Sequence, residues 1–257
     1  MSARSARRRG RGKGPFTLGI DIGGTHLKAS VLDRNGAETT PHVAMTTPHP
    51  APPERVLALL DGMLHALPAF DRISVGFPGA VKQGRISTAP SLDTADWHDY
   101  PLATELMRRW SRPARVLNDA EVQGLGVIEG KGLECVLTLG TGFGSALYRD
   151  GDVMPHLELG QHPLRKGNTY DEYVGAAALE RKGIDKWNRR VQRAIEAVKI
   201  LLNYDRLYLG GGNATHIRFD LPPNVTVVSN EAGITGGIRL WDKRYDGLFP
   251  KALAALS

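Results

Sequence analysis

The stretch FTLGIDIGGTHLKASVLDRNG, residues 16–36, decides the fold. It predicts an apolar strand from Phe16 to Ile22, a glycine turn at Gly23-Gly24, and a returning strand that ends at the hairpin turn Asn35-Gly36. The same order of strand, glycine turn, strand and hairpin turn occurs again in CVLTLGTGFGSALYRDG, residues 135–151. Two such units predict a duplicated architecture with two similar lobes that face each other.

Strands and helices alternate in the rest of the chain. Apolar residues at helical spacing predict helices at 56–67, 103–110 and 191–202, and short apolar runs predict strands at 72–77, 114–117, 206–209 and 225–228. This alternation is typical of an α/β fold.

The basic residues are unevenly distributed along the chain. The chain has 257 residues, of which 41% are hydrophobic and 23% charged, a balance typical of a soluble globular protein, and its formal net charge is +6. Six of the basic residues and no acid lie within residues 1–14, so the rest of the chain carries equal numbers of acids and bases. We expect residues 1–15 to form a disordered tail, and we expect no specific nucleic-acid site, because the body is neutral.

Several other classes are disfavoured. The single cysteine, Cys135, excludes a disulfide framework and a thiolate zinc cluster, so no structural zinc is expected. The chain has no apolar run of the roughly eighteen residues that a membrane span needs, and no apolar segment follows the basic tail as in a secretory signal. We therefore expect a cytoplasmic protein without a membrane partner.

The two glycine turns favour phosphate binding. In DIGGT (Asp21 to Thr25) and LGTGFG (Leu139 to Gly144), glycines let backbone N–H groups approach an anion, and Thr25 and Thr141 add hydroxyl donors. A strand follows each turn, which is unlike a Walker A loop or a Rossmann fingerprint. One such turn alone is more often a tight hairpin, but two together favour phosphate. Asp21 either caps its turn or lies near a Mg2+ ion.

Six segments, in order, resemble the ROK family of sugar kinases, and most closely its short polyphosphate/ATP glucokinase branch. They are DIGGTHLKASVLD (21–33), VGFPGAV (75–81), VLNDAEVQGLG (116–126), LTLGTGFGSAL (137–147), ELG (158–160) and LYLGGGNA (207–214). The resemblance implies an actin-like, ribonuclease H-type fold with a cleft between two lobes. It also implies transfer of a phosphoryl group from polyphosphate or ATP to the 6-hydroxyl of glucose or a related hexose, with Mg2+, in a protein that is commonly a homodimer.

On this basis we expect an N-terminal lobe at 16–117 and a C-terminal lobe at 118–245. A C-terminal helix at 246–257 is expected to cross back and complete the first lobe.

The resemblance also assigns roles to single residues. Asp119 matches the family's general base, although an Asp between a strand and a helix is by itself more often a plain helix cap. Asn118, the turn Pro78-Gly79 and Glu158 match sugar-binding positions. The implied phosphate- and nucleotide-binding residues are Gly23, Gly24, Thr25, Lys28, Thr141, Gly142, Gly144, Gly210, Gly211, Gly212 and Asn213, and the implied metal-binding residue is Asp21.

Two positions depart from the family pattern. Gln161 stands where a histidine normally follows Glu-Leu-Gly, and Ser91 stands where the family usually has a sugar-binding Asn. Both side chains can still bind a hydroxyl, but with different reach, so the identity of the hexose is open. A metal site at His156 and His162 is disfavoured, because the family's zinc motif is Cys-rich and no cysteine lies there.

A catalytically weak or inactive sugar-binding or regulatory protein is the alternative. The family's repressors carry an N-terminal winged helix-turn-helix domain, and only about fifteen residues precede the first expected strand here. The presence of Asp119 favours the enzyme, because a pure binder does not need the base.

Overall fold

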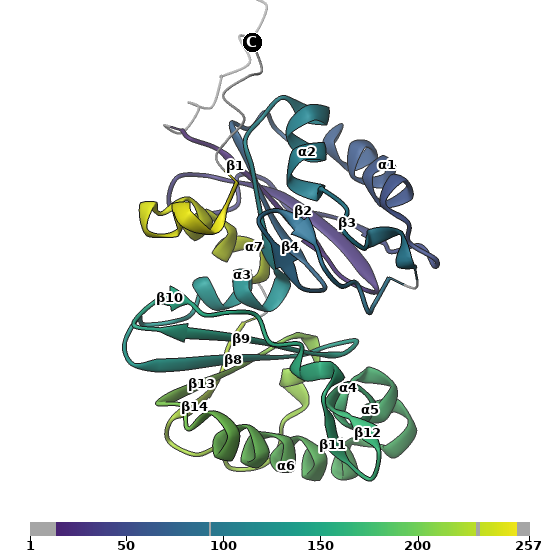
Figure 1. The fold of residues 1–257 in the computed structure, drawn as a ribbon, viewed down its shortest axis with the longest axis vertical. Helices are drawn as coiled ribbons and strands as arrows, with labels where there is room; N and C mark the ends of the chain where they lie inside the picture. The colour runs from purple at the N-terminus through teal and green to yellow at the C-terminus, as the bar shows by residue number, and fades with distance from the viewer. Residues whose placement is uncertain (1–13, 93, 230–231, 251–257) are drawn as a thin grey trace, which may run out of the picture.

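Two five-stranded sheets with the same topology form the framework of the computed structural model, which describes residues 14–92, 94–229 and 232–250 (Figure 1). The first sheet has the order β3-β2-β1-β4-β7 and the second β10-β9-β8-β13-β14. In each, an antiparallel three-stranded meander is extended by two parallel strands. The repeat expected from the two glycine turns is therefore confirmed as a duplicated α/β fold.

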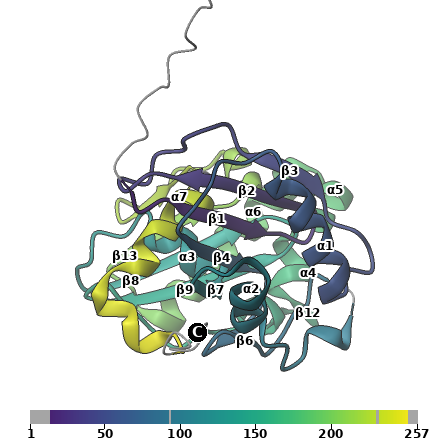
Figure 2. The same ribbon diagram turned by 90° about the horizontal axis from the view of Figure 1, so that it is seen from above.

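The first lobe consists of the first sheet with α1 (Pro53–Leu64) and α2 (Leu102–Trp110). Both helices turn their apolar faces to the sheet and share one core with it (Figure 2). Pro53 lies in the first turn of α1, where a missing N–H costs nothing. The strands are β1 (Thr17–Ile22), β2 (His26–Leu32), β3 (Val43–Thr46), β4 (Arg72–Phe77) and β7 (Ala114–Asn118), with a small hairpin of β5 (Val81–Lys82) and β6 (Arg85–Ile86).

The second lobe consists of the second sheet with α4 (Tyr170–Val174), α5 (Ala176–Lys182) and α6 (Ile184–Leu202). The apolar face of α6 packs on the sheet, and the Trp187 indole N–H donates to the carbonyl oxygen of Val174 at 2.7 Å, which fixes α6 to α4. The strands are β8 (Leu133–Leu139), β9 (Phe143–Arg149), β10 (Asp152–Val153), β13 (Arg206–Gly210) and β14 (Val225–Val227), with a separate hairpin of β11 (Pro163–Arg165) and β12 (Asn168–Thr169).

The helix α3 (Asp119–Leu125) lies between the two sheets and contacts both of them (Figure 1). Its buried residues join a third apolar cluster with side chains of the second sheet. The Tyr148 hydroxyl on β9 donates to the carbonyl oxygen of Glu121 at 2.5 Å. The helix therefore places its N-terminus where the two lobes meet.

The chain returns to the first sheet near its C-terminus. The short helix α7 (Ala232–Thr235) and the 3-10 segment Gly236–Trp241 pack on β1 and α3, and Ser74 of β4 donates to the carbonyl oxygen of Gly237 at 2.7 Å. The chain thus returns to the first lobe at α7, earlier than the segment 246–257 that the sequence analysis predicted for this return. A 3-10 turn covers Lys243–Leu248, and the rest of the expected helix, 251–257, lies outside the described residues. None of the helices in the described ranges has the length and apolar character needed to traverse a bilayer.

Candidate active site

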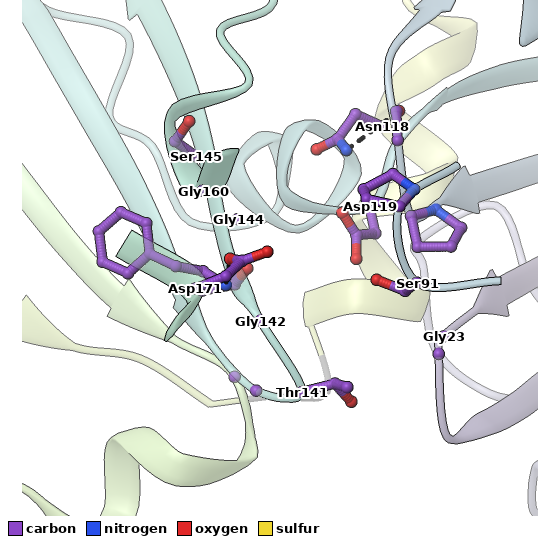
Figure 3. Close-up of a pocket in the computed structure, with 18 of the residues that line it drawn as sticks. Gly23, Ser91, Asn118, Asp119, Thr141, Gly142, Gly144, Ser145, Gly160 and Asp171 are labelled. Atoms are coloured by element: carbon purple, nitrogen blue, oxygen red, sulfur yellow. Dashed lines mark hydrogen bonds between the residues drawn. The ribbon is translucent and has the colours of Figure 1, made fainter. Parts of the chain in front are cut away.

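One pocket between the lobes collects most of the residues that the sequence singled out (Figure 3). Residues at the carboxyl ends of β1, β4 and β7 form its first-lobe side, and the glycine turn between β8 and β9 forms the other. The predicted residues that line it are Asp21, Gly23, Gly24, Pro78, Gly79, Ser91, Asn118, Asp119, Thr141, Gly142, Gly144, Glu158, Gln161, Gly211 and Gly212.

An adjoining pocket is lined by three further predicted residues, Thr25, Lys28 and Asn213. It shares Asp21 and both glycine turns with the first pocket, so the two form one continuous site. Gly210 lines neither pocket. It is the buried last residue of β13, where a Cβ atom would lie only 2.6 Å from the Gln123 amide.

Asp119 is the first residue of α3, and its carboxylate points into the pocket (Figure 3). The preceding Asn118 is the helix cap: its side-chain oxygen accepts from the Ala120 N–H at 2.9 Å, and Glu121 accepts from the Asn118 N–H at 3.0 Å. This reciprocal capping explains why the helix begins here, and it makes Asp119 unnecessary as a cap.

The pKa of Asp119 lies far above that of an ordinary aspartate. Burial raises it most and the charge of Asp21 raises it further, while a hydrogen bond from the Ala120 N–H and the charge of His156 oppose the shift; the result is a pKa of about 7. Burial also raises the pKa of Asp21, and Lys28 partly offsets this. Two carboxylates that repel each other in a cleft are typical of a functional site.

The two glycine turns meet across the cleft. The hydroxyl oxygens of Thr25 and Thr141 lie 2.9 Å apart, although the two residues are far apart in the sequence. Gly24 permits a close approach, because a Cβ atom there would lie 2.9 Å from that of Ser91. Residues of both turns therefore border the same space, as an anion site built from both turns requires.

The residues predicted to bind sugar line the same pocket. Asn118 donates its side-chain N–H groups to the carbonyl oxygens of Phe77 and Gly79, at 3.3 and 3.2 Å, and so holds the Pro78-Gly79 turn. Glu158 accepts from the Ala80 N–H at 3.1 Å and from the Thr88 hydroxyl. Although burial opposes its ionisation, the nearby His156 ring and hydrogen bonds from Thr88 and Ala80 hold the pKa of Glu158 below its usual range.

The structure adds Asp171 to the site, which the sequence analysis missed. Its carboxylate accepts from the Gln161 amide at 2.7 Å and from the Phe143 N–H at 2.6 Å, and it lines the pocket. Burial raises its pKa. Asp171 lies in the first turn of α4, after the capping residue Thr169, where an acidic residue is common in any helix. No sequence signal therefore distinguished it.

The histidines near Glu158 differ in their surroundings. His156 lines the pocket, whereas His162 is exposed outside it. Among the described residues, no group of three or more His, Cys, Asp or Glu side chains is arranged to hold a metal ion.

Comparisons with known proteins give one consistent answer. The ROK family model matches residues 17–157. A polyphosphate glucokinase of Mycobacterium tuberculosis is 29% identical over 205 residues, which cover 76% of this chain and 77% of that protein.

Solved structures agree. The inorganic polyphosphate/ATP-glucomannokinase of Arthrobacter sp. strain KM is 30% identical, with a TM-score of 0.79 over 88% of this chain and 98% of that one. A ROK family glucokinase from Streptomyces griseus, 19% identical, shares the fold with a TM-score of 0.70 over 88% of this chain and 98% of its own. The duplicated sheets are thus those of the actin-like two-lobe fold, and this chain belongs to the ROK family.

Proposed function

We propose that this protein is a hexose kinase that transfers a phosphoryl group from polyphosphate or ATP to the 6-hydroxyl of glucose or a related hexose. The observation that carries the proposal is the carboxylate of Asp119, which lies in the pocket between the lobes with a pKa of about 7. A general base works best when its pKa is close to the working pH, and ordinary aspartates are far too weak as bases for this. The relatives named polyphosphate glucokinase and polyphosphate/ATP-glucomannokinase support the same reaction class.

Asp119 takes the proton from the attacking sugar hydroxyl in this mechanism. Its place at the N-terminus of α3, fixed by the Asn118 and Glu121 cap, orients the carboxylate toward the pocket. Phosphoryl transfer requires mainly alignment and neutralisation of charge, so one base and a set of donors suffice.

The phosphate chain of the donor binds along the two glycine turns. Residues of both turns line the continuous pocket, the hydroxyls of Thr25 and Thr141 lie between the turns, and Lys28 provides a cation in the adjoining part. Asn213 donates to the carbonyl oxygen of Gly140 at 3.1 Å and so joins the GGGN segment to the second turn. Both ATP and polyphosphate present such a chain.

A divalent metal such as Mg2+ fits the carboxylates at the base of this pocket. Asp21 and Asp119 are oxygen ligands of the kind that Mg2+ prefers, and the charge of Asp21 already raises the pKa of Asp119, so a cation at Asp21 would relieve their repulsion. When bound there, the metal neutralises charge on the phosphate oxygens. The positive charge of Lys28 partly offsets the rise in the pKa of Asp21 and so favours its ionised form.

The sugar binds between the Pro78-Gly79 turn, Ser91, Asn118 and Glu158, with Gln161 beside them. The Gln161 amide already donates one N–H to Asp171, so its side-chain oxygen and its second N–H are left to face a hydroxyl. The homodimer and the cytoplasmic location expected from the sequence stay predictions.

The test is a coupled assay with glucose, mannose, fructose and N-acetylglucosamine, each with ATP or polyphosphate and with Mg2+ present. We expect turnover for at least one pair, and its loss in Asp119→Asn. Absence of transfer for every pair would refute the proposal. Sugar binding without transfer would identify the non-catalytic alternative instead.

A further inference from the structure

The side chain of His156 bridges two glutamates at the edge of the sugar site. Its Nδ1 atom lies 3.1 Å from Oε1 of Glu121, and its Nε2 atom lies 3.7 Å from Oε1 of Glu158. Only 11% of the His156 side chain and 5% of the Glu121 side chain are exposed. The bridge is therefore enclosed by protein, where charged groups interact more strongly than at the surface.

The charge of His156 is unusual for this pocket. Four carboxylates line the first of the two adjoining pockets, those of Asp21, Asp119, Glu158 and Asp171. Among the described residues, the lining of this first pocket contains no lysine or arginine, since Lys28 lines the second pocket. Burial favours the neutral ring, but the hydrogen bond to Glu121 and the charges of Glu121 and Glu158 outweigh it and raise the pKa of His156 to about 9. The ring is thus a cation at neutral pH, and it partly balances the acidic lining.

The His156 cation also acts on Glu158, whose Oε1 atom lies 3.7 Å from Nε2. Its Oε1 atom accepts from the Ala80 N–H and from the Thr88 hydroxyl, whereas Oε2 has no hydrogen bond to any residue that the structure describes. An ionised carboxylate only accepts hydrogen bonds, so Oε2 is free to accept hydrogen bonds from the hydroxyl groups of a sugar. The cation favours this ionised form.

Glu121 connects the bridge to the catalytic helix. Its Oε2 atom accepts from the Asn118 N–H at 3.0 Å and so caps the helix that begins with Asp119, while its Oε1 atom contacts His156. One chain of contacts therefore runs from the start of α3 in the middle of the molecule to Glu158.

We propose that His156 is a positioning residue of the sugar site, a cation that holds the Glu158 carboxylate in place through its bridge to Glu121. This inference rests on the proposed function, which assigns Glu158 to the sugar.

A double-mutant cycle tests whether His156 acts through Glu158. The variants are His156→Gln, Glu158→Gln and the pair, and the readouts are the sugar KM and kcat at pH 8 together with the sugar Kd by calorimetry. We expect His156→Gln to raise the sugar KM and Kd about tenfold and to change kcat less than about threefold, as loss of one charge-assisted contact would. In the Glu158→Gln background, the same change should add less than about twofold.

Two further variants control for a nonspecific effect of the substitution and for a loss of stability. His162→Gln is the matched control, because it changes an exposed histidine six positions away, and it should leave KM and Kd unchanged. His156→Gln leaves the buried Glu121 without its cation, which can destabilise the fold. The pair His156→Gln with Glu121→Gln removes that charge as well, and we expect it to show the same rise in KM.

Two outcomes would overturn the inference alone: an unchanged sugar KM and Kd in both His156 variants, or equal effects of His156→Gln with and without Glu158. A wild-type protein that binds hexoses but transfers no phosphoryl group would refute the proposed function, while the Kd cycle would still decide the role of His156. A wild-type protein that binds no hexose would overturn both.

Discussion

Replacing Asp119 with Asn tests the catalytic assignment most directly. The change removes one ionisable oxygen and keeps the shape of the side chain. The remaining amide oxygen can accept from the Ala120 N–H as the carboxylate does now, at 2.8 Å. Asn118 and Glu121 still cap α3, so we expect the helix and the fold to be preserved.

The expected loss of kcat is about 10²–10⁴-fold, the usual contribution of a general base. The stability should not fall, because the variant no longer buries a carboxylate that Asp21 repels. The sugar Kd should stay within about threefold of wild type, since the base contributes mainly in the transition state.

The pH dependence gives an independent test of the same residue. Asp119 must be ionised to accept a proton, and its pKa in the free protein is raised to about 7, so kcat/KM should be constant well above pH 7 and fall about tenfold per pH unit below it. An aspartate with an ordinary pKa would leave kcat/KM flat down to about pH 5.

The assay couples sugar phosphate formation to a dehydrogenase, with thermal denaturation and calorimetry of sugar binding as controls on the fold and on the pocket. A variant that is folded, binds sugar and keeps more than about a tenth of the wild-type kcat would place the base elsewhere. A wild-type profile that is flat between pH 5.5 and 8, values chosen to bracket the pKa of about 7, would contradict the environment described for Asp119.

Three other predictions concern the pocket, the fold and the tail. Glu158→Gln should raise the sugar KM about tenfold with a smaller effect on kcat, and steady-state kinetics showing an unchanged KM for every sugar would remove Glu158 from the pocket. Gly211→Ala should lower the free energy of unfolding by more than about 1 kcal/mol in a denaturant titration, because Gly211 has a φ of +82° and an added Cβ would lie 2.4 Å from the Leu139 carbonyl oxygen. The control Gly62→Ala, in the last turn of α1 where an added Cβ meets nothing within 4 Å, should be neutral or stabilising. Deleting residues 2–14, which carry six bases and no acid, should raise KM for polyphosphate at low salt and leave KM for ATP unchanged; an equal polyphosphate KM at low ionic strength would show that the tail does not attract the donor.

Much of the framework follows from local sequence. The turn at Gly23-Gly24 and the later LGTGFG turn each lie between two apolar strands, and the structure forms the expected antiparallel pairs β1–β2 and β8–β9. Helical spacing likewise identified α1, α2 and α6. The sequence analysis placed the return of the chain to the first sheet at 246–257, but the return begins at α7. The sequence did not reveal α7, because four residues are too few to show a helical period.

The features of the candidate site likewise divide into those that the sequence determined and those that only the tertiary structure decided. The sequence by itself determined which residues are brought to the cleft: polar and glycine residues at strand ends must gather at one edge of each sheet, which is why Asp21 and Asp119 line one pocket. Only the tertiary structure decided their interactions. Asp171 accepts a hydrogen bond from Gln161, and His156 contacts both Glu121 and Glu158. No local sequence pattern predicts these contacts. The pKa of about 7 at Asp119 is likewise a product of burial and of the charge of Asp21, 98 positions away, and neither exists until the chain is folded.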